Sequence, residues 1–107
     1  MIKLNIKPLS VNQAWQGKRF KTPKYLTYET DLLKILPKLN IIDPPYRLNI
    51  LVGFSSKSSD LDNVLKPFLD ILQKKYNIND KDFKILHVEK QIVSKKNDFI
   101  SFEIVSV

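Results

Sequence analysis

Residues 59–76 read SDLDNVLKPFLDILQKKY and carry the clearest structural signal in the chain. Apolar side chains recur there at the spacing of one helical face, namely Leu61, Val64, Leu65, Phe68 and Leu72. The pattern predicts a helix over residues 60–76 that packs this stripe against a sheet, and in a purely structural interpretation Asp60 is its N-cap. Pro67 lies inside the helix and removes a backbone hydrogen bond, so we expect a bend or an early end there.

Strand patterns flank this helix on both sides. Strands are expected at residues 1–7, 46–54, 83–94 and 99–107. A second helix is expected at residues 26–36, with Thr27 as its N-cap and Pro37 after its end, and residues 8–25 are expected to form a long functional loop.

The order β-α-β-α-β-β predicts a single α/β (α+β) domain over residues 1–107, with a mixed sheet of about four strands and two main helices packed on it. The strand–helix–strand unit predicts a parallel pair, and the last two strands are expected to form an antiparallel hairpin.

The charge balance favours a polyanionic partner. The chain has 107 residues, with 18 Lys and Arg against 11 Asp and Glu, and its net charge is +7. Its isoelectric point near 9.6 is typical of a nucleic-acid binder, although charge also serves solubility alone. Almost all of the cations are lysines, which favours contact with the phosphate backbone over direct reading of bases.

The residue types restrict the possible metals and compartments. There is no cysteine and only one histidine, His87, which excludes disulfides, thiolate sites and histidine-rich zinc sites. A metal would therefore bind oxygen ligands, which suits Mg²⁺ or Mn²⁺. The first residues lack the apolar core of a signal peptide, and no apolar run approaches the roughly 18 residues of a membrane span, so we expect a cytoplasmic protein.

Three aspartates are candidates for metal-dependent chemistry. Asp60 and Asp62 lie where the helix begins, and Asp80 follows it. The helix dipole alone explains acidic residues in a first turn. If the three carboxylates converge, their repulsion calls for a divalent cation, as in phosphodiester hydrolysis. Lys66, one turn further on, is placed to meet a phosphate, or else to form an exposed salt bridge with Asp62 or Asp70.

The long loop carries a second candidate surface. Cations surround an aromatic ring there, in Lys18, Arg19, Phe20, Lys21 and Lys24. Such an arm could follow a phosphate backbone while Trp15, Phe20 or Tyr25 stacks on a base, or it could be a solvated loop with an apolar anchor. We interpret His87 as a strand residue without a catalytic role.

The run DLDNVLKPFLDIL at residues 60–72 resembles the signature of the RusA-type Holliday junction resolvases, an endodeoxyribonuclease family common in prophages. Weaker similarities flank it. PLSVN at residues 8–12 is similar to the early loop of the family, and INDKDF at residues 78–83 is similar to its acidic turn.

The resemblance implies a Mg²⁺-dependent homodimer that resolves four-way DNA junctions by paired symmetric nicks in recombination and repair, with Mn²⁺ as a possible substitute. It implies Asp60, Asp62 and Asp80 as metal ligands and Lys66 as a catalytic lysine. Asn79 stands where the family often has a first acid, which leaves Asp82 as an alternative to Asp80.

The DNA-binding residues expected from the loops and the helix are Asn12, Lys18, Arg19, Lys21, Lys24 and Lys66. Two other functions remain open from the sequence. One is a non-catalytic basic DNA-binding module whose acids only cap helices. The other is a protein that binds a protein partner and has no role with nucleic acid.

Overall fold

The computed structural model describes residues 1–17, 20–41 and 43–107. A four-stranded sheet in the order β1-β6-β4-β5 forms its base. The elements of the chain are β1 (Ile2–Leu4), α1 (Val11–Ala14), β2 (Trp15–Gln16), β3 (Phe20–Lys21), α2 (Pro23–Ile35), β4 (Tyr46–Phe54), α3 (Leu61–Tyr76), the 3₁₀ helix η1 (Asp80–Asp82), β5 (Phe83–Ile92) and β6 (Phe99–Ser106). The expected mixed α+β fold is confirmed.

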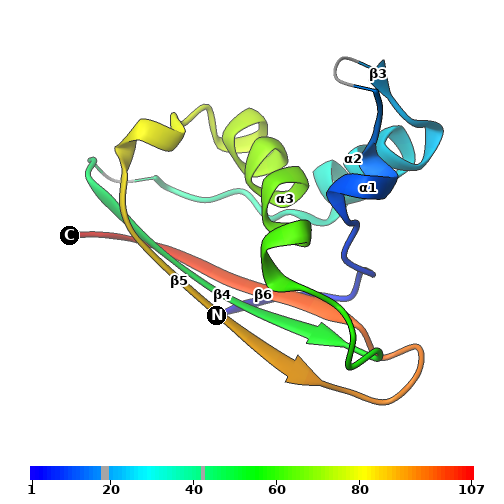
Figure 1. Ribbon diagram of the computed structural model, residues 1–107. Helices are drawn as coiled ribbons and strands as arrows, with labels where there is room; N and C mark the ends of the chain where they lie inside the picture. Colours follow the sequence, from blue (N-terminus) through cyan, green and yellow to red (C-terminus); the bar gives the residue numbers. More distant parts are fainter. Residues whose placement is uncertain (18–19, 42) are drawn as a thin grey trace.

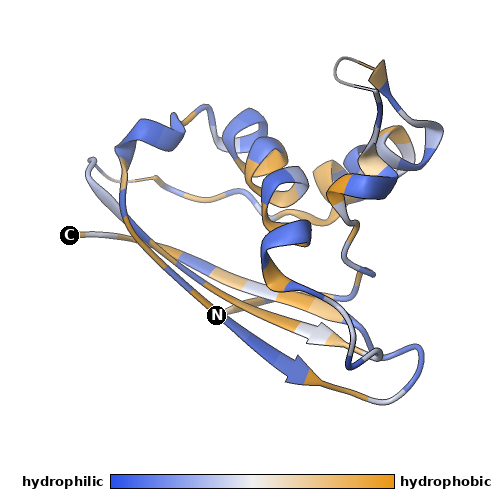
Figure 2. Cartoon of the chain, viewed as in Figure 1, coloured by the Kyte–Doolittle hydropathy of each residue, from blue (hydrophilic) through white to orange (hydrophobic). Residues whose placement is uncertain are grey.

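Helices α2 and α3 lie on one face of the sheet (Figure 1). The apolar stripe predicted for α3 packs into the core, where Val64, Phe68 and Leu72 are buried. The ring of Phe68 meets that of Phe102 on β6 edge-on, with centroids 5.7 Å apart. Figure 2 shows the complementary pattern, with apolar stretches along the strands and a hydrophilic η1.

Helix α3 continues through its proline. It runs for 16 residues with Pro67 inside, so the expected early end at the proline is wrong. Pro67 is fully buried, and the core contacts of the turns on either side hold the helix together despite the missing hydrogen bond. The helix ends at Asn77, whose left-handed φ of 53° turns the chain toward η1.

The pairing of the last two strands differs from the expectation. Strand β4 pairs in parallel with β5 and antiparallel with β6, so the expected β5–β6 hairpin is wrong. The first half of β6 is buried, whereas most of β5 is exposed. The more apolar strand therefore takes the interior position and the polar strand becomes an edge.

The expected long loop at residues 8–25 is wrong for the part that the structure describes, residues 8–17 and 20–25. This part contains α1, the paired strands β2 and β3, and the first turn of α2. Helix α2 begins at Pro23 because Thr22 accepts a hydrogen bond from the Tyr25 amide at 3.2 Å and a proline suits the first helical position. The predicted cap at Thr27 is therefore wrong. No helix in the described residues is long and apolar enough to cross a membrane.

One carboxylate ties the helices to the small hairpin. Glu29 on α2 lies 2.9 Å from the Lys74 ammonium on α3 and 3.7 Å from that of Lys21. The hydrogen bond from Lys74 lowers the pKa of Glu29, and the charges of Lys21 and Lys74 add to this effect against an opposing contribution from burial.

We expect Glu29→Gln to lower the free energy of unfolding by about 0.5–1 kcal/mol at pH 7. Because the pKa of Glu29 is lowered in the folded state, this contribution is present above the usual glutamate pKa and is lost as the pH falls below it. Urea titrations at pH 7 and pH 3 measure the difference, with the exposed Asp31→Asn as control. If Glu29→Gln lowered the free energy of unfolding equally at both pH values, the stabilising charge interaction assigned to Glu29 would be contradicted.

Candidate functional site

The best candidate site lies where the chain leaves β4 and enters α3. A hollow of about 360 Å³ opens there, and we call it the serine hollow. It is lined by Lys7, Pro8, Ser10, Asn12, Gln13, Phe54, Ser55, Ser56, Ser58, Ser59, Asp60, Asn63, Val64 and Asp98. Of the residues predicted from sequence, Asp60 and Asn12 meet in this hollow.

Asp60 precedes the first turn of α3 without capping it by its side chain. Its backbone is extended, as at an N-cap, but the carboxylate makes no capping hydrogen bond. Its one side-chain hydrogen bond within the described residues is a long one, 3.4 Å, from the Asn63 amide. The carboxylate is exposed, so its oxygens are available to a ligand.

Asp62 and Lys66 lie on the outer face of α3, one turn apart. Asp62 is exposed in the first turn, at the positive end of the helix dipole. The Lys66 ammonium lies 3.5 Å from Asp70 and 5.5 Å from the centre of the Trp15 ring. The expected salt bridge to Asp70 is confirmed, and because the Lys66 side chain is 66% exposed, this pair holds the lysine only weakly.

Asp80 lies at the opposite end of α3. The 16-residue helix between Asp60 and Asp80 is about 24 Å long. Figure 1 shows the segment that follows α3 at the opposite end of the helix from its start. The backbone N–H of Asp80 donates to the Gln73 side chain at 3.1 Å, which anchors η1 to the last turns of α3. Asp82 belongs to the same short helix and lies at the same end.

The expected convergence of Asp60, Asp62 and Asp80 therefore does not occur within one chain. Among the described residues, no group of three acidic or histidine side chains is placed to hold a metal ion. The reason is the topology. In a parallel strand–helix–strand unit, the helix starts at the carboxyl end of the first strand and finishes at the amino end of the second.

The basic arm is partly fixed to the fold. Lys21 pairs with Glu29 and lies 4.9 Å from the centre of the Tyr25 ring, so it supports the packing of α2. Phe20, which is 73% exposed, remains available for stacking, and Lys24 is exposed. Lys18 and Arg19 lie outside the residues that the structure describes.

His87 is a strand residue, as expected. It lies on β5, and its Nε2 is 2.8 Å from a Glu89 carboxylate oxygen, with both side chains more than half exposed.

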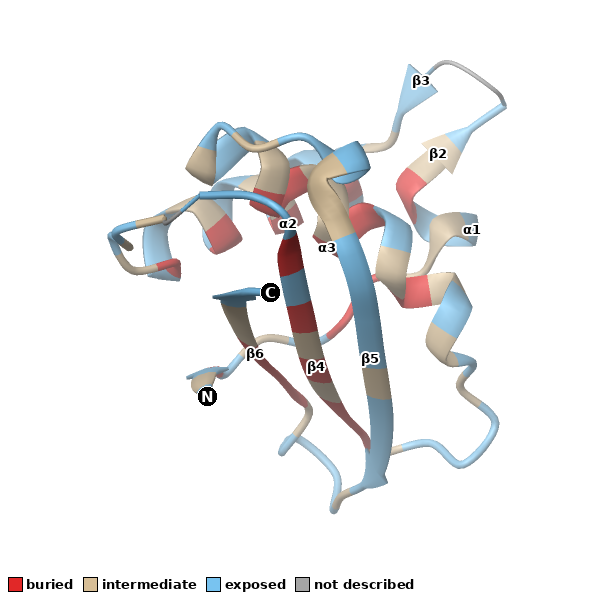
Figure 3. Cartoon of the chain, turned by 90° about the vertical axis from the view of Figure 1, so that its left-hand side faces the viewer, coloured by how far each residue is buried: buried red, intermediate tan, exposed pale blue. Residues whose placement is uncertain are grey.

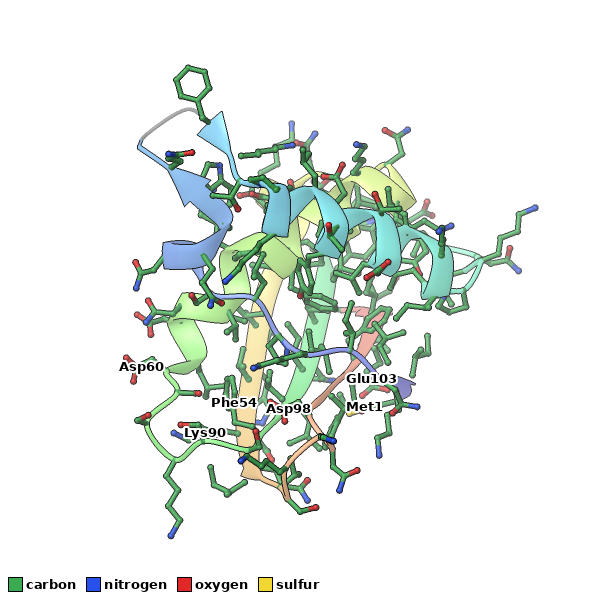
Figure 4. The ribbon with its side chains drawn as sticks, turned by 90° about the vertical axis from the view of Figure 1, so that its right-hand side faces the viewer. Met1, Phe54, Asp60, Lys90, Asp98 and Glu103 are labelled. Atoms are coloured by element: carbon green, nitrogen blue, oxygen red, sulfur yellow. The ribbon has the colours of Figure 1, made fainter. Side chains whose placement is uncertain are left out.

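Sequence reasoning missed the hydroxyl groups and one acid of the serine hollow. Neither the serines at residues 55–59 nor Asp98 was among the candidate residues predicted from the sequence. Asp98 reaches the hollow because β6 starts beside the end of β4, where Phe99 pairs with Gly53. Figure 4 shows Phe54, Asp60 and Asp98 at the same end of the molecule.

A comparison with protein-family models gave no match, and a comparison with curated proteins gave none either. The similarity to the RusA-type resolvases therefore rests on the motif residues of this sequence alone.

A pair of alanine substitutions separates capping from other roles at Asp60. Thr22 caps α2 through its hydroxyl, so Thr22→Ala should cost about 1 kcal/mol of stability. Asp60 makes no such bond, so Asp60→Ala should cost less, through the helix dipole only. Chemical denaturation of both variants measures this, and an equal or larger loss for Asp60→Ala would assign it a capping role.

Proposed function

We propose that this protein is a Mg²⁺-dependent endodeoxyribonuclease that resolves Holliday junctions by paired nicks. One observation carries the proposal. Asp60 lines a polar hollow at the start of α3, and Asp62 lies two residues further on in the first turn of the helix. Both carboxylates are exposed, with no ion pair to either among the described residues, in a chain of net charge +7. The helix dipole favours acids at this position, and the lack of an ion pair leaves both carboxylates available to a cation.

The donors at this end of α3 fit a hard cation. Mg²⁺ binds oxygen ligands, commonly carboxylates together with waters and substrate phosphates, and Asp60 and Asp62 supply two of these carboxylates. The bound cation would polarise a phosphoryl oxygen and lower the pKa of a water molecule. Lys66, held loosely on the same side of the helix, stabilises negative charge on the phosphate or the leaving oxygen.

The third carboxylate comes from a second copy of the chain. Strand β5 is a sheet edge of ten residues, almost all of them exposed along its length (Figure 3). A long, free edge readily pairs with another chain. Two copies related by a two-fold axis perpendicular to the sheet pair their β5 strands antiparallel, edge to edge.

That pairing brings Asp80 of each copy toward Asp60 of the other. Antiparallel pairing places the amino end of one β5 beside the carboxyl end of the other, with the strands about 4.8 Å apart. Asp80 lies just before the amino end of β5, and Asp60 lies above its carboxyl end, where the Lys90 ammonium donates to the Ser59 carbonyl at 2.9 Å. A two-fold dimer also suits the two-fold symmetry of a four-way junction.

We expect Asp62→Asn to abolish Mg²⁺-dependent cleavage of a synthetic four-way junction, because one ligand charge is lost. Binding of the junction should be unchanged or tighter, because a charge that repels phosphate is gone. Gel assays of cleavage and binding measure both effects, with Asp31→Asn as the matched control. Cleavage at the wild-type rate by Asp62→Asn would refute the proposed site.

The same assay in EDTA tests the alternative of a non-catalytic DNA-binding module. That alternative is favoured by one observation, the absence of a three-acid cluster among the described residues of one chain. Junction binding with no metal-dependent product from the wild-type protein would support the module and refute the nuclease.

A charge on the β5 edge tests the dimer. Leu86 is 47% exposed on β5, and Leu26 is 52% exposed on α2. We expect Leu86→Lys to convert the dimer to a monomer and to abolish cleavage, because each site then lacks its Asp80, whereas Leu26→Lys should remain dimeric. Light scattering with size-exclusion chromatography measures the mass. A monomeric wild type, or a dimeric Leu86→Lys, would refute this interface.

A further inference from the structure

A second and larger hollow adjoins the serine hollow. Its volume is about 980 Å³, and we call it the lysine hollow. It forms between the segment after β1, the end of β5 and the turn before β6. These segments meet because β1 and β4 both pair antiparallel with β6, with Leu4 opposite Ile100 and Gly53 opposite Phe99.

The lining of this hollow is strongly cationic. Four lysines contribute to it, namely Lys3, Lys7, Lys95 and Lys96, against a single acid, Asp98. Within the described part of the chain, none of the four lysines forms an ion pair. The Lys3 ammonium instead lies 4.6 Å from the centre of the Phe99 ring. The lining therefore keeps an excess of positive charge, which no ion pair of these lysines offsets.

The two hollows are neighbours. Lys7, Ser55 and Asp98 line both of them, so a chain-like ligand at Asp60 would have the lysine hollow next to it. The remaining polar lining includes the side chains of Asn5, Gln91, Ser94 and Asn97, which can donate hydrogen bonds to phosphate oxygens.

The backbone of the turn adds an independent indication. Lys96 adopts a left-handed conformation with φ of 68°, which a glycine would adopt without steric strain. In this turn, the backbone N–H of Asn97 donates a hydrogen bond to the backbone carbonyl of Ser94 at 3.1 Å. A lysine at a position that favours glycine is better explained by its charge than by the needs of the turn.

We propose that the lysine hollow binds the phosphodiester backbone of the DNA strand that passes the Asp60 site. This inference rests on the proposed action on DNA and extends it to a surface that none of the sequence motifs includes. The contacts are to phosphates rather than bases, because the lining cations are all lysines, which bind phosphate as point charges. A concave, polar and cationic surface suits an extended polyanion better than a flat membrane or an apolar protein surface.

Matched double variants test the proposal. Lys95→Gln/Lys96→Gln removes two charges from the hollow, and Lys34→Gln/Lys38→Gln removes two exposed charges from α2 and the segment after it. Binding of a fluorescent four-way junction and of its single arms is measured from 50 to 300 mM salt in EDTA. The hollow variant should make the negative slope of log K against log salt shallower by about 2 and weaken binding roughly tenfold at 0.1 M salt. The control variant should leave the slope unchanged.

The possible results separate this inference from the proposed function. Equal losses in the two double variants would overturn the inference, since net charge alone would explain them. If the wild type cleaves the junction in a metal-dependent way and the hollow variant binds DNA as tightly as the wild type, the inference is overturned and the nuclease proposal stands. A wild type that binds no DNA would overturn both. Equal affinity for polyglutamate and for DNA would overturn the assignment to DNA.

Lys96→Gly distinguishes a structural role from a binding role. It removes the charge and also relieves the left-handed conformation, so it should raise the melting temperature while it weakens DNA binding. A variant that is more stable and binds DNA like the wild type would overturn the proposal.

Discussion

The packing of α3 onto β4 and β6 is the constraint from which the rest of the structure follows. The apolar stripe of α3 lies in the centre of the core, where Phe68 packs against Phe102. This contact fixes the direction of the helix across the sheet. Because α3 connects two parallel strands, its start must lie at the carboxyl end of β4 and its end at the amino end of β5. The same packing thus exposes Asp60 and Asp62 at the start of α3 and carries Asp80 away from them.

The sequence of α3 and β4 is enough to predict both elements, because each carries a dense apolar pattern that its own packing satisfies. Strand β4 has the expected bounds, and α3 starts one residue after the expected one. The N-terminal region was less predictable. Thr22 and Pro23 start α2 by local capping. The buried face of this helix includes Tyr25 and Tyr28, and these tyrosines did not form a recognisable apolar stripe in the sequence.

The order of the strands and the position of the third carboxylate depend on competition between segments distant in the chain. Strands β5 and β6 can both pair with β4, but only one of them can take an interior position in the sheet. The strand whose apolar side chains would lose more free energy by exposure to water takes that position. Strand β6 buries Phe99, Ile100 and Phe102, whereas β5 carries Lys84, His87 and Glu89. The expectation that Asp60, Asp62 and Asp80 act together comes from the family resemblance. Their spacing along the chain does not say whether they meet within one copy or between two.

A site divided between two copies has a consequence for control. If each metal site takes Asp60 and Asp62 from one chain and Asp80 from the other, a monomer has no complete set of ligands and cannot cut a single strand. Both sites then form together when β5 pairs with its symmetry mate, so activity appears only in the assembly that can address two strands of a junction. Under this proposal, the exposed polar edge of β5, which is a liability in a monomer, would be the element that couples assembly to cleavage.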